Sequence, residues 1–137
     1  MRNICFFNFF ILALFFSFDL FALSPVEEGV YFKNIQHAQK LTSPFTIEML
    51  VVGKKVAPAG DPTPGTGHHH LIINGPYFEE GQIIPADEKH IHYGQGETQA
   101  KVDLAPGKYT LTLQFADMNH ISFGKDWARS IVVEVVD

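Results

Sequence analysis

Alternation of apolar and polar residues with a period of two dominates this sequence beyond its first two dozen residues. The run FTIEMLVVG, residues 45–53, puts Phe45, Ile47, Met49 and Val51 on one side and polar residues opposite them. The same pattern recurs in residues 98–107, 108–117 and 130–137. Successive side chains of a β-strand point to opposite faces, so this period predicts half-buried antiparallel strands.

Turn-forming residues separate these runs, as in the Gly-Asp-Pro of 60–62, the Asn-Gly-Pro of 74–76 and the Pro-Gly of 106–107. Weaker strands fit residues 28–34 and 68–74. No window of ten or more residues keeps a helical period. The sequence therefore predicts an all-β fold, a small immunoglobulin-like β-sandwich of about seven antiparallel strands. A closed barrel is the alternative.

The N-terminal segment, residues 1–24, has the plan of a cleaved signal peptide. Arg2 precedes a long apolar run, and small residues follow it at Ala22 and Ser24, either of which can mark the cleavage site. A membrane anchor is the weaker interpretation, because polar residues interrupt the run: Asn8, Ser17 and Asp19. We therefore expect one domain, residues 25–137, in the bacterial periplasm or secreted, with no membrane span after processing.

Composition excludes several classes of function. The single cysteine, Cys5, lies in the predicted leader, so the mature chain has neither a disulfide nor a thiolate ligand. The net charge is −5, and Lys54-Lys55 is the longest basic run after the leader. Phosphate binding needs a basic patch, so we expect no nucleic-acid partner.

Histidines carry the strongest functional signal. Six of the seven fall in three groups: HHH at 68–70, HIH at 90–92, and His120 in DMNH, next to Asp117 and Met118. Side chains two apart on a strand share a face, so His68 pairs with His70 and His90 with His92. His69 shares its parity with core residues and is predicted to be structural. His37 is predicted to be a solvated surface residue.

Neutral imidazole suits copper and zinc, whereas calcium and magnesium prefer oxygen ligands. The sequence therefore predicts a copper or zinc site, copper in preference to zinc, that serves metal buffering or delivery. The candidate ligands are His68, His70, His90, His92, His120 and Asp117. Asp117 can instead accept a hydrogen bond that fixes a ring tautomer. Asp87 and Glu88 are expected at the rim.

Two alternatives stay open. Histidines that only stabilise turns would fit an envelope structural or protein-interaction domain, with residues 76–84 as a recognition loop carrying Tyr77 and Phe78. A metal-dependent enzyme would need an open coordination position and a nearby acid or base, such as Asp87, Glu88 or Glu97. Binding is favoured over catalysis, and the sequence assigns no catalytic residue and no organic cofactor.

Three blocks of the chain, APAGDPTPGTGHHHLIIN, IPADEKHIHYGQGETQ and LAPGKYTLTLQFADMNHISF, resemble an uncharacterised family of small exported bacterial proteins, a domain of unknown function. The resemblance covers residues 28–136 and implies a periplasmic or extracellular all-β domain. Copper/zinc superoxide dismutase is similar only in its H-x-H strands, and small periplasmic copper carriers are the better analogy. The positions matching the family blocks are Gly67, His68, His69, His70, Pro85, Ala86, Asp87, His90, His92, Gly94, Gly96, Thr98, Pro106, Gly107, Asp117 and His120.

Overall fold

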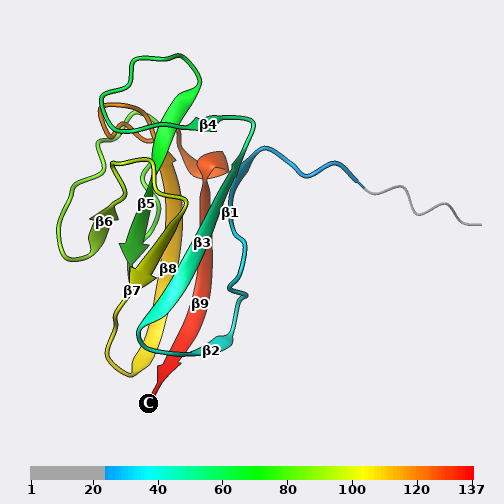
Figure 1. Cartoon of the computed structure of the whole chain (residues 1–137), viewed down its shortest axis with the longest axis vertical. Coiled ribbons are helices and arrows are strands. Elements are labelled where there is room, and N and C mark those ends of the chain that lie inside the picture. The colour runs from blue at the N-terminus through cyan, green and yellow to red at the C-terminus, as the bar shows by residue number, and fades with distance from the viewer. Residues whose placement is uncertain (1–23) are drawn as a thin grey trace, which may run out of the picture.

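A computed structural model describes residues 24–137, which form two packed β-sheets (Figure 1). The predicted signal peptide lies, apart from Ser24, outside the described residues. Within residues 24–137 there is no α-helix, and one 3-10 turn, η1 (Lys125–Trp127), precedes the last strand. No helix in this part of the chain has the length and apolar character needed to cross a membrane.

The smaller sheet has three antiparallel strands in the order β1-β3-β7. Its central strand is β3 (Phe45–Val52), with β1 (Gly29–Phe32) on one side and β7 (Gln99–Val102) on the other. Apolar and polar residues alternate along β3 as the sequence predicts, with Phe45, Ile47 and Met49 buried.

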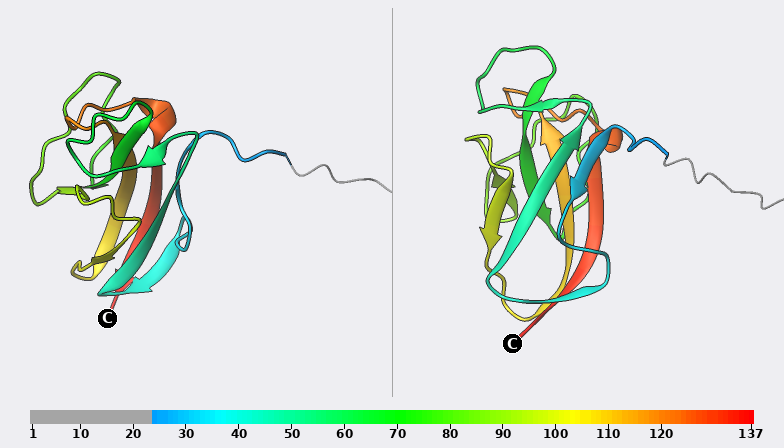
Figure 2. Two further views of the ribbon diagram at one scale, coloured as in Figure 1. Left: turned by 45° about the horizontal axis from the view of Figure 1, so that its top comes forward. Right: turned by 45° about the vertical axis from the view of Figure 1, so that its right-hand side comes forward.

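The larger sheet has the order β2-β9-β8-β5-β4, and β6 also pairs with β5. Its longest strands are β8 (Gly107–Ala116) and β9 (Ala128–Val136), joined in an antiparallel pair. The other strands are β2 (Gln39–Thr42), β4 (Lys55–Val56), β5 (Thr66–Ile73) and β6 (His90–His92). In the right-hand view of Figure 2, the long strands β5, β8 and β9 of this sheet lie behind β3.

The core lies between the two sheets. Leu111, Leu113 and Phe115 of β8 are fully buried there, and Phe115 is joined by the partly buried rings of Phe123 and Trp127. Burying an apolar side chain of this size stabilises a fold by roughly 1.5–3 kcal/mol. The apolar faces of β3 and β8, one from each sheet, therefore both contribute to the core.

The predicted two-sheet sandwich is confirmed, and two separate sheets take the place of the alternative closed barrel. The described residues form nine strands, including the two-residue β4 and three-residue β6. Two pairs, β2 with β9 and β4 with β5, are parallel. Strand β5 is buried from Gly67 to Ile73, on both of its faces. Because both faces of β5 are buried, all three of its histidines are buried as well.

Candidate metal centre

The three consecutive histidines of β5 divide between the two faces of the larger sheet. His69 points into the core, where its ring packs edge-on against Phe115 with 5.0 Å between centroids. His68 and His70 therefore point to the outer face, because neighbouring side chains of a strand alternate. All three have no exposed surface.

Loops cover the outer face above His68 and His70. Gln114 lies opposite His70 on β8, and its side chain bonds both backbone groups of Phe78: the Phe78 N–H donates to Oε1 at 2.8 Å, and Nε2 donates to the carbonyl at 2.7 Å. The Ser122 hydroxyl also donates to the Phe78 carbonyl at 2.8 Å. These bonds satisfy buried polar groups and tie two loops to the sheet.

His92 joins the β5 pair from the neighbouring strand. It lies directly opposite His70 in the β5–β6 register. The His92 ring centroid is 4.8 Å from that of His68 and 5.1 Å from that of His70. The Nε2 atoms of His68 and His70 are themselves 3.1 Å apart. One ligand nitrogen from each of the three lies within 4.8 Å of the others, a spacing that can hold a metal ion.

His120, in the turn after β8, lies beside these three rings. Its ring centroid lies 4.3 Å from His92, 5.2 Å from His68 and 5.5 Å from His70. We call His68, His70, His92 and His120 the imidazole cluster. His120 has a φ of 66°, in the left-handed region that non-glycine residues seldom adopt. Strained backbone of this kind gathers at functional sites.

Asp117 holds this turn together. Its Oδ1 accepts the backbone N–H groups of Asn119 at 2.8 Å and Ile121 at 2.9 Å. Its carbonyl accepts the N–H of His120 at 3.0 Å. The bonds of this Asp turn fix the backbone that presents His120. Asp117 was a candidate ligand in the sequence, and one of its carboxylate oxygens is hydrogen-bonded to the backbone instead. The neighbouring Met118 is 36% exposed.

Burial favours the neutral form of His68, His70 and His92. Burial, and then the proximity of His92 and His120, lowers the pKa of His68 to about 4. Burial, and then His68, lowers the pKa of His70 to about 2. The pKa of His92 is lowered by burial and by His120, against the opposing charge of Glu97. Neutral imidazoles are the form that binds metal ions.

Several ring nitrogens of the cluster have no hydrogen-bond partner. These buried atoms are Nδ1 of His68, Nδ1 of His70 and Nε2 of His92. A buried polar atom without a partner costs about 1–3 kcal/mol. Two nitrogens bound about 2.0–2.1 Å from one ion, at angles of roughly 90–110°, lie about 2.9–3.4 Å apart. The 3.1 Å between the Nε2 atoms of His68 and His70 falls in that range.

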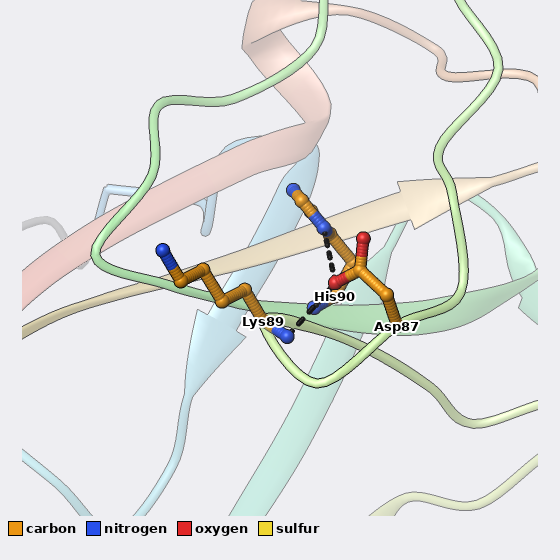
Figure 3. Close-up of polar contacts among 3 residues, drawn as sticks. All are labelled: Asp87, Lys89 and His90. Carbon is orange, nitrogen blue, oxygen red and sulfur yellow. Dashed lines mark hydrogen bonds and ion pairs between the residues drawn. The ribbon is translucent and has the colours of Figure 1, made fainter.

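His90, the other candidate on β6, does not join the cluster. It lies opposite Ile72, two residues along the strand from His92. Its Nδ1 is 2.8 Å from Oδ1 of Asp87, which also accepts the backbone N–H of Lys89 (Figure 3). The ring of Phe78 contacts it edge-on at 5.5 Å between centroids. The structure therefore places the predicted H-x-H pair on one face but gives its members different partners.

The other residues that the sequence singled out do not belong to the imidazole cluster. His37 is exposed, as predicted, and its Nδ1 accepts the backbone N–H of Val132 at 3.2 Å. A surface cavity of about 600 Å³ is lined by Tyr77, Trp127 and Arg129, and no histidine forms its wall. Asp87 and Glu88 are exposed, and Glu97 is half-buried beside the cluster, where its charge acts on His68 and His92.

Gly94 matches the family blocks in sequence, but its contact with the imidazole cluster was not predicted. A Cβ at this position would overlap Cε1 and Nε2 of His92, so the Gly94 backbone packs directly on that ring. The sequence carries a signal, a glycine two residues after the second histidine of HIH, but a contact between backbone and ring is visible only in the fold.

Comparison with known proteins identifies a family. The profile of a family described as "Domain of unknown function (DUF4399)" matches residues 47–136, the stretch that contains every member of the imidazole cluster. No curated protein and no solved structure matches the chain.

Proposed function

We propose that this chain, which belongs to the family described as Domain of unknown function (DUF4399), binds a transition-metal ion through His68, His70 and His92, with His120 beside them as a fourth ligand. The observation that carries the proposal is the convergence of these four rings, whose centroids are all within 5.5 Å of one another. Imidazoles gathered this closely, half of them fully buried, repel one another when protonated, and three of their buried nitrogens have no hydrogen-bond partner. A bound cation is coordinated by the neutral rings and so favours the form in which they do not repel one another.

Copper is the metal that this donor set favours. Nitrogen-only sites bind divalent copper more tightly than zinc, following the general order of first-row metals. The described residues contain no cysteine, so no thiolate competes for selection of zinc. Zinc remains compatible with the same nitrogens and is the second metal to test.

Binding for buffering or delivery fits this site better than catalysis. His68 and His70 are fully buried, and His92 and His120 are half-buried, so the rings leave little space for a substrate. The large surface cavity lies elsewhere. Hydrolytic or redox catalysis needs an open coordination position and a proton-transfer group beside it.

Export is part of the same proposal. The order of basic, apolar and small residues in positions 1–24 supports a signal peptide, and the absence of cysteine beyond it suits an oxidising compartment. In the periplasm or outside the cell, a histidine site of this kind would hold copper without thiol chemistry.

Titration of the processed chain, purified without a metal-affinity step, tests the proposal. Wild-type protein should bind one copper(II) ion tightly, detected by its ligand-field absorption and by calorimetry. His92→Gln should weaken binding at least tenfold. His90→Gln is the matched control: it lies on the same strand and face but outside the cluster, and should keep the wild-type affinity.

Two outcomes would contradict the proposal. Wild-type protein that binds neither copper nor zinc would identify the histidines as a structural network, consistent with the 3.1 Å contact between His68 and His70. Binding that His90→Gln removes and His92→Gln retains would place the site elsewhere.

A further inference from the structure

The four imidazoles of the cluster are not equally fixed. His68 and His70 lie in the middle of the larger sheet and are completely buried. His92 ends the three-residue strand β6, and His120 lies in a turn, and both are half-buried. Any ion must therefore reach the buried pair from the side of His92 and His120. What holds these two rings in place decides how the ion is bound and exchanged.

The Gly94 backbone presses on the His92 ring. A Cβ on Gly94 would overlap two ring atoms, Cε1 and Nε2, and would lie 3.1 Å from Nδ1. Gly94 does not have a positive φ, so its lack of a side chain is needed for this contact and not for backbone conformation. The contact limits the orientations that the His92 ring can adopt.

One segment, Pro58–Gly60, connects the two loops that carry the outer histidines. The backbone N–H of Ala59 donates to the Gly94 carbonyl at 2.9 Å, and the N–H of Gly60 donates to the Met118 carbonyl at 3.0 Å. Just before the segment, the N–H of Ala57 donates to the carbonyl of Gly67, next to His68 on β5, at 2.7 Å. We call Pro58–Gly60 the strap.

The strap thus joins three backbone positions that surround the cluster. It is anchored beside His68, bonded to the glycine that packs on His92, and bonded to the turn that presents His120. Its bonds are few and lie in a partly exposed loop, so this part of the fold opens more easily than the sheet. The surrounding strands do not need these two hydrogen bonds to stay paired.

From this arrangement we infer that Gly94 and the strap are positioning elements of the metal site: they hold His92 and His120 against the buried pair, and an ion is exchanged when the strap opens. This inference rests on the proposed function. The Gly94 contact then sets the affinity for the metal ion. The backbone hydrogen bonds of Ala59 and Gly60 set the rate at which the ion is exchanged.

The first test measures the copper(II) affinity of the Gly94→Ala variant by competition with a chelator. The new methyl group displaces His92, so affinity should fall at least tenfold while the β-type circular dichroism is kept. Gly75→Ala is the matched control. Its Cβ would also meet a side chain, Cγ2 of Ile72 at 2.7 Å, and Gly75 likewise has no positive φ. That control should lose stability without losing copper affinity.

The second test removes the hydrogen bond between the strap and Gly94. Ala59→Pro lacks the N–H that donates to the Gly94 carbonyl, whereas Ala59→Ser keeps it. Release of copper to excess EDTA, followed by stopped-flow absorption, should be at least tenfold faster in Ala59→Pro than in the wild type. Ala59→Ser should release copper at the wild-type rate.

Failure of the inference is distinguishable from failure of the proposed function. A wild-type chain that binds no copper refutes the proposed function. Tight binding by the wild type, with equal affinity in Gly94→Ala and an equal release rate in Ala59→Pro, refutes the positioning role and leaves the site intact. Equal losses in Gly94→Ala and Gly75→Ala would also refute it, because the loss would then follow general destabilisation.

Discussion

His69 is a buried imidazole that the metal site does not use, and its replacement gives a sharp prediction about stability. Its ring lies between the sheets against Phe115, and neither ring nitrogen has a hydrogen-bond partner. Burial, and then the charge of His68, lowers the pKa of His69 from its ordinary value of 6.5 to about 4. His69→Leu keeps the apolar contact and removes both unpartnered nitrogens.

The stability difference between His69→Leu and the wild type depends on pH, and the direction of this dependence follows from the lowered pKa of His69. Between pH 6.5 and pH 4 the unfolded chain binds a proton at His69 and the folded chain does not, so acid favours unfolding. From pH 7 to pH 5 this linkage costs the wild type about 2 kcal/mol. Replacing the imidazole, whose two nitrogens have no hydrogen-bond partner, raises the free energy of unfolding of His69→Leu by about 1–3 kcal/mol at either pH. His69→Leu should therefore be more stable by about 1–3 kcal/mol at pH 7 and about 3–5 kcal/mol at pH 5.

Urea unfolding of metal-free protein, followed by circular dichroism at both pH values, measures this difference. Leu71→Ala is the matched control, because Leu71 lies on the same face of β5 and carries no titrating group. It should lose about 2–5 kcal/mol relative to the wild type, by the same amount at both pH values. If the gain from His69→Leu does not grow as the pH falls, or if the variant is destabilised, our account of His69 is wrong.

Three further predictions concern the core, the His120 turn and export. Phe115→Ala should lower the free energy of unfolding by about 3–5 kcal/mol in urea titrations, because its ring is fully buried between the sheets; a loss below 1 kcal/mol would contradict that packing. Asp117→Ala should weaken copper binding about tenfold by releasing two backbone N–H groups, each bond to a charged acceptor being worth about 1.5–3 kcal/mol. Asp117→Asn keeps the acceptor oxygen and should bind nearly as the wild type, whereas equal losses would indicate a carboxylate ligand. Mass spectrometry of the exported protein should find a chain that begins between Leu23 and Glu27, and an intact Met1 would refute cleavage.

The sheet framework was predictable because β3 and β8 each have one face made of large apolar residues. In β3 and β8 the period of two identifies that face without knowledge of the partner strand. The same reasoning placed His69 inside and His68 and His70 together on the other face. The parallel pairs β2–β9 and β4–β5 were not predictable, since strand order depends on contacts between residues far apart in sequence.

The sequence could not fully predict which of the candidate histidines belong to the imidazole cluster. His90 and His92 are equivalent in an alternating pattern, and only the β5–β6 register sets His92 beside His70 and His90 beside Ile72. The turn after β8 explains why Asp117 binds backbone while His120 reaches the cluster. Gly94 matches the family blocks, but its contact with the His92 ring could not be predicted from sequence, because it depends on the fold.

The most direct test of the central claim is to count the nitrogen ligands of copper bound to the processed wild-type chain. Electron paramagnetic resonance of the copper(II) form, with X-ray absorption at the copper edge, should show three or four imidazole nitrogens and no sulfur, as the cluster provides. His92→Gln should reduce that number by one, and His90→Gln should leave it unchanged. A spectrum dominated by oxygen ligands, or one that neither variant alters, would contradict a metal site at His68, His70, His92 and His120.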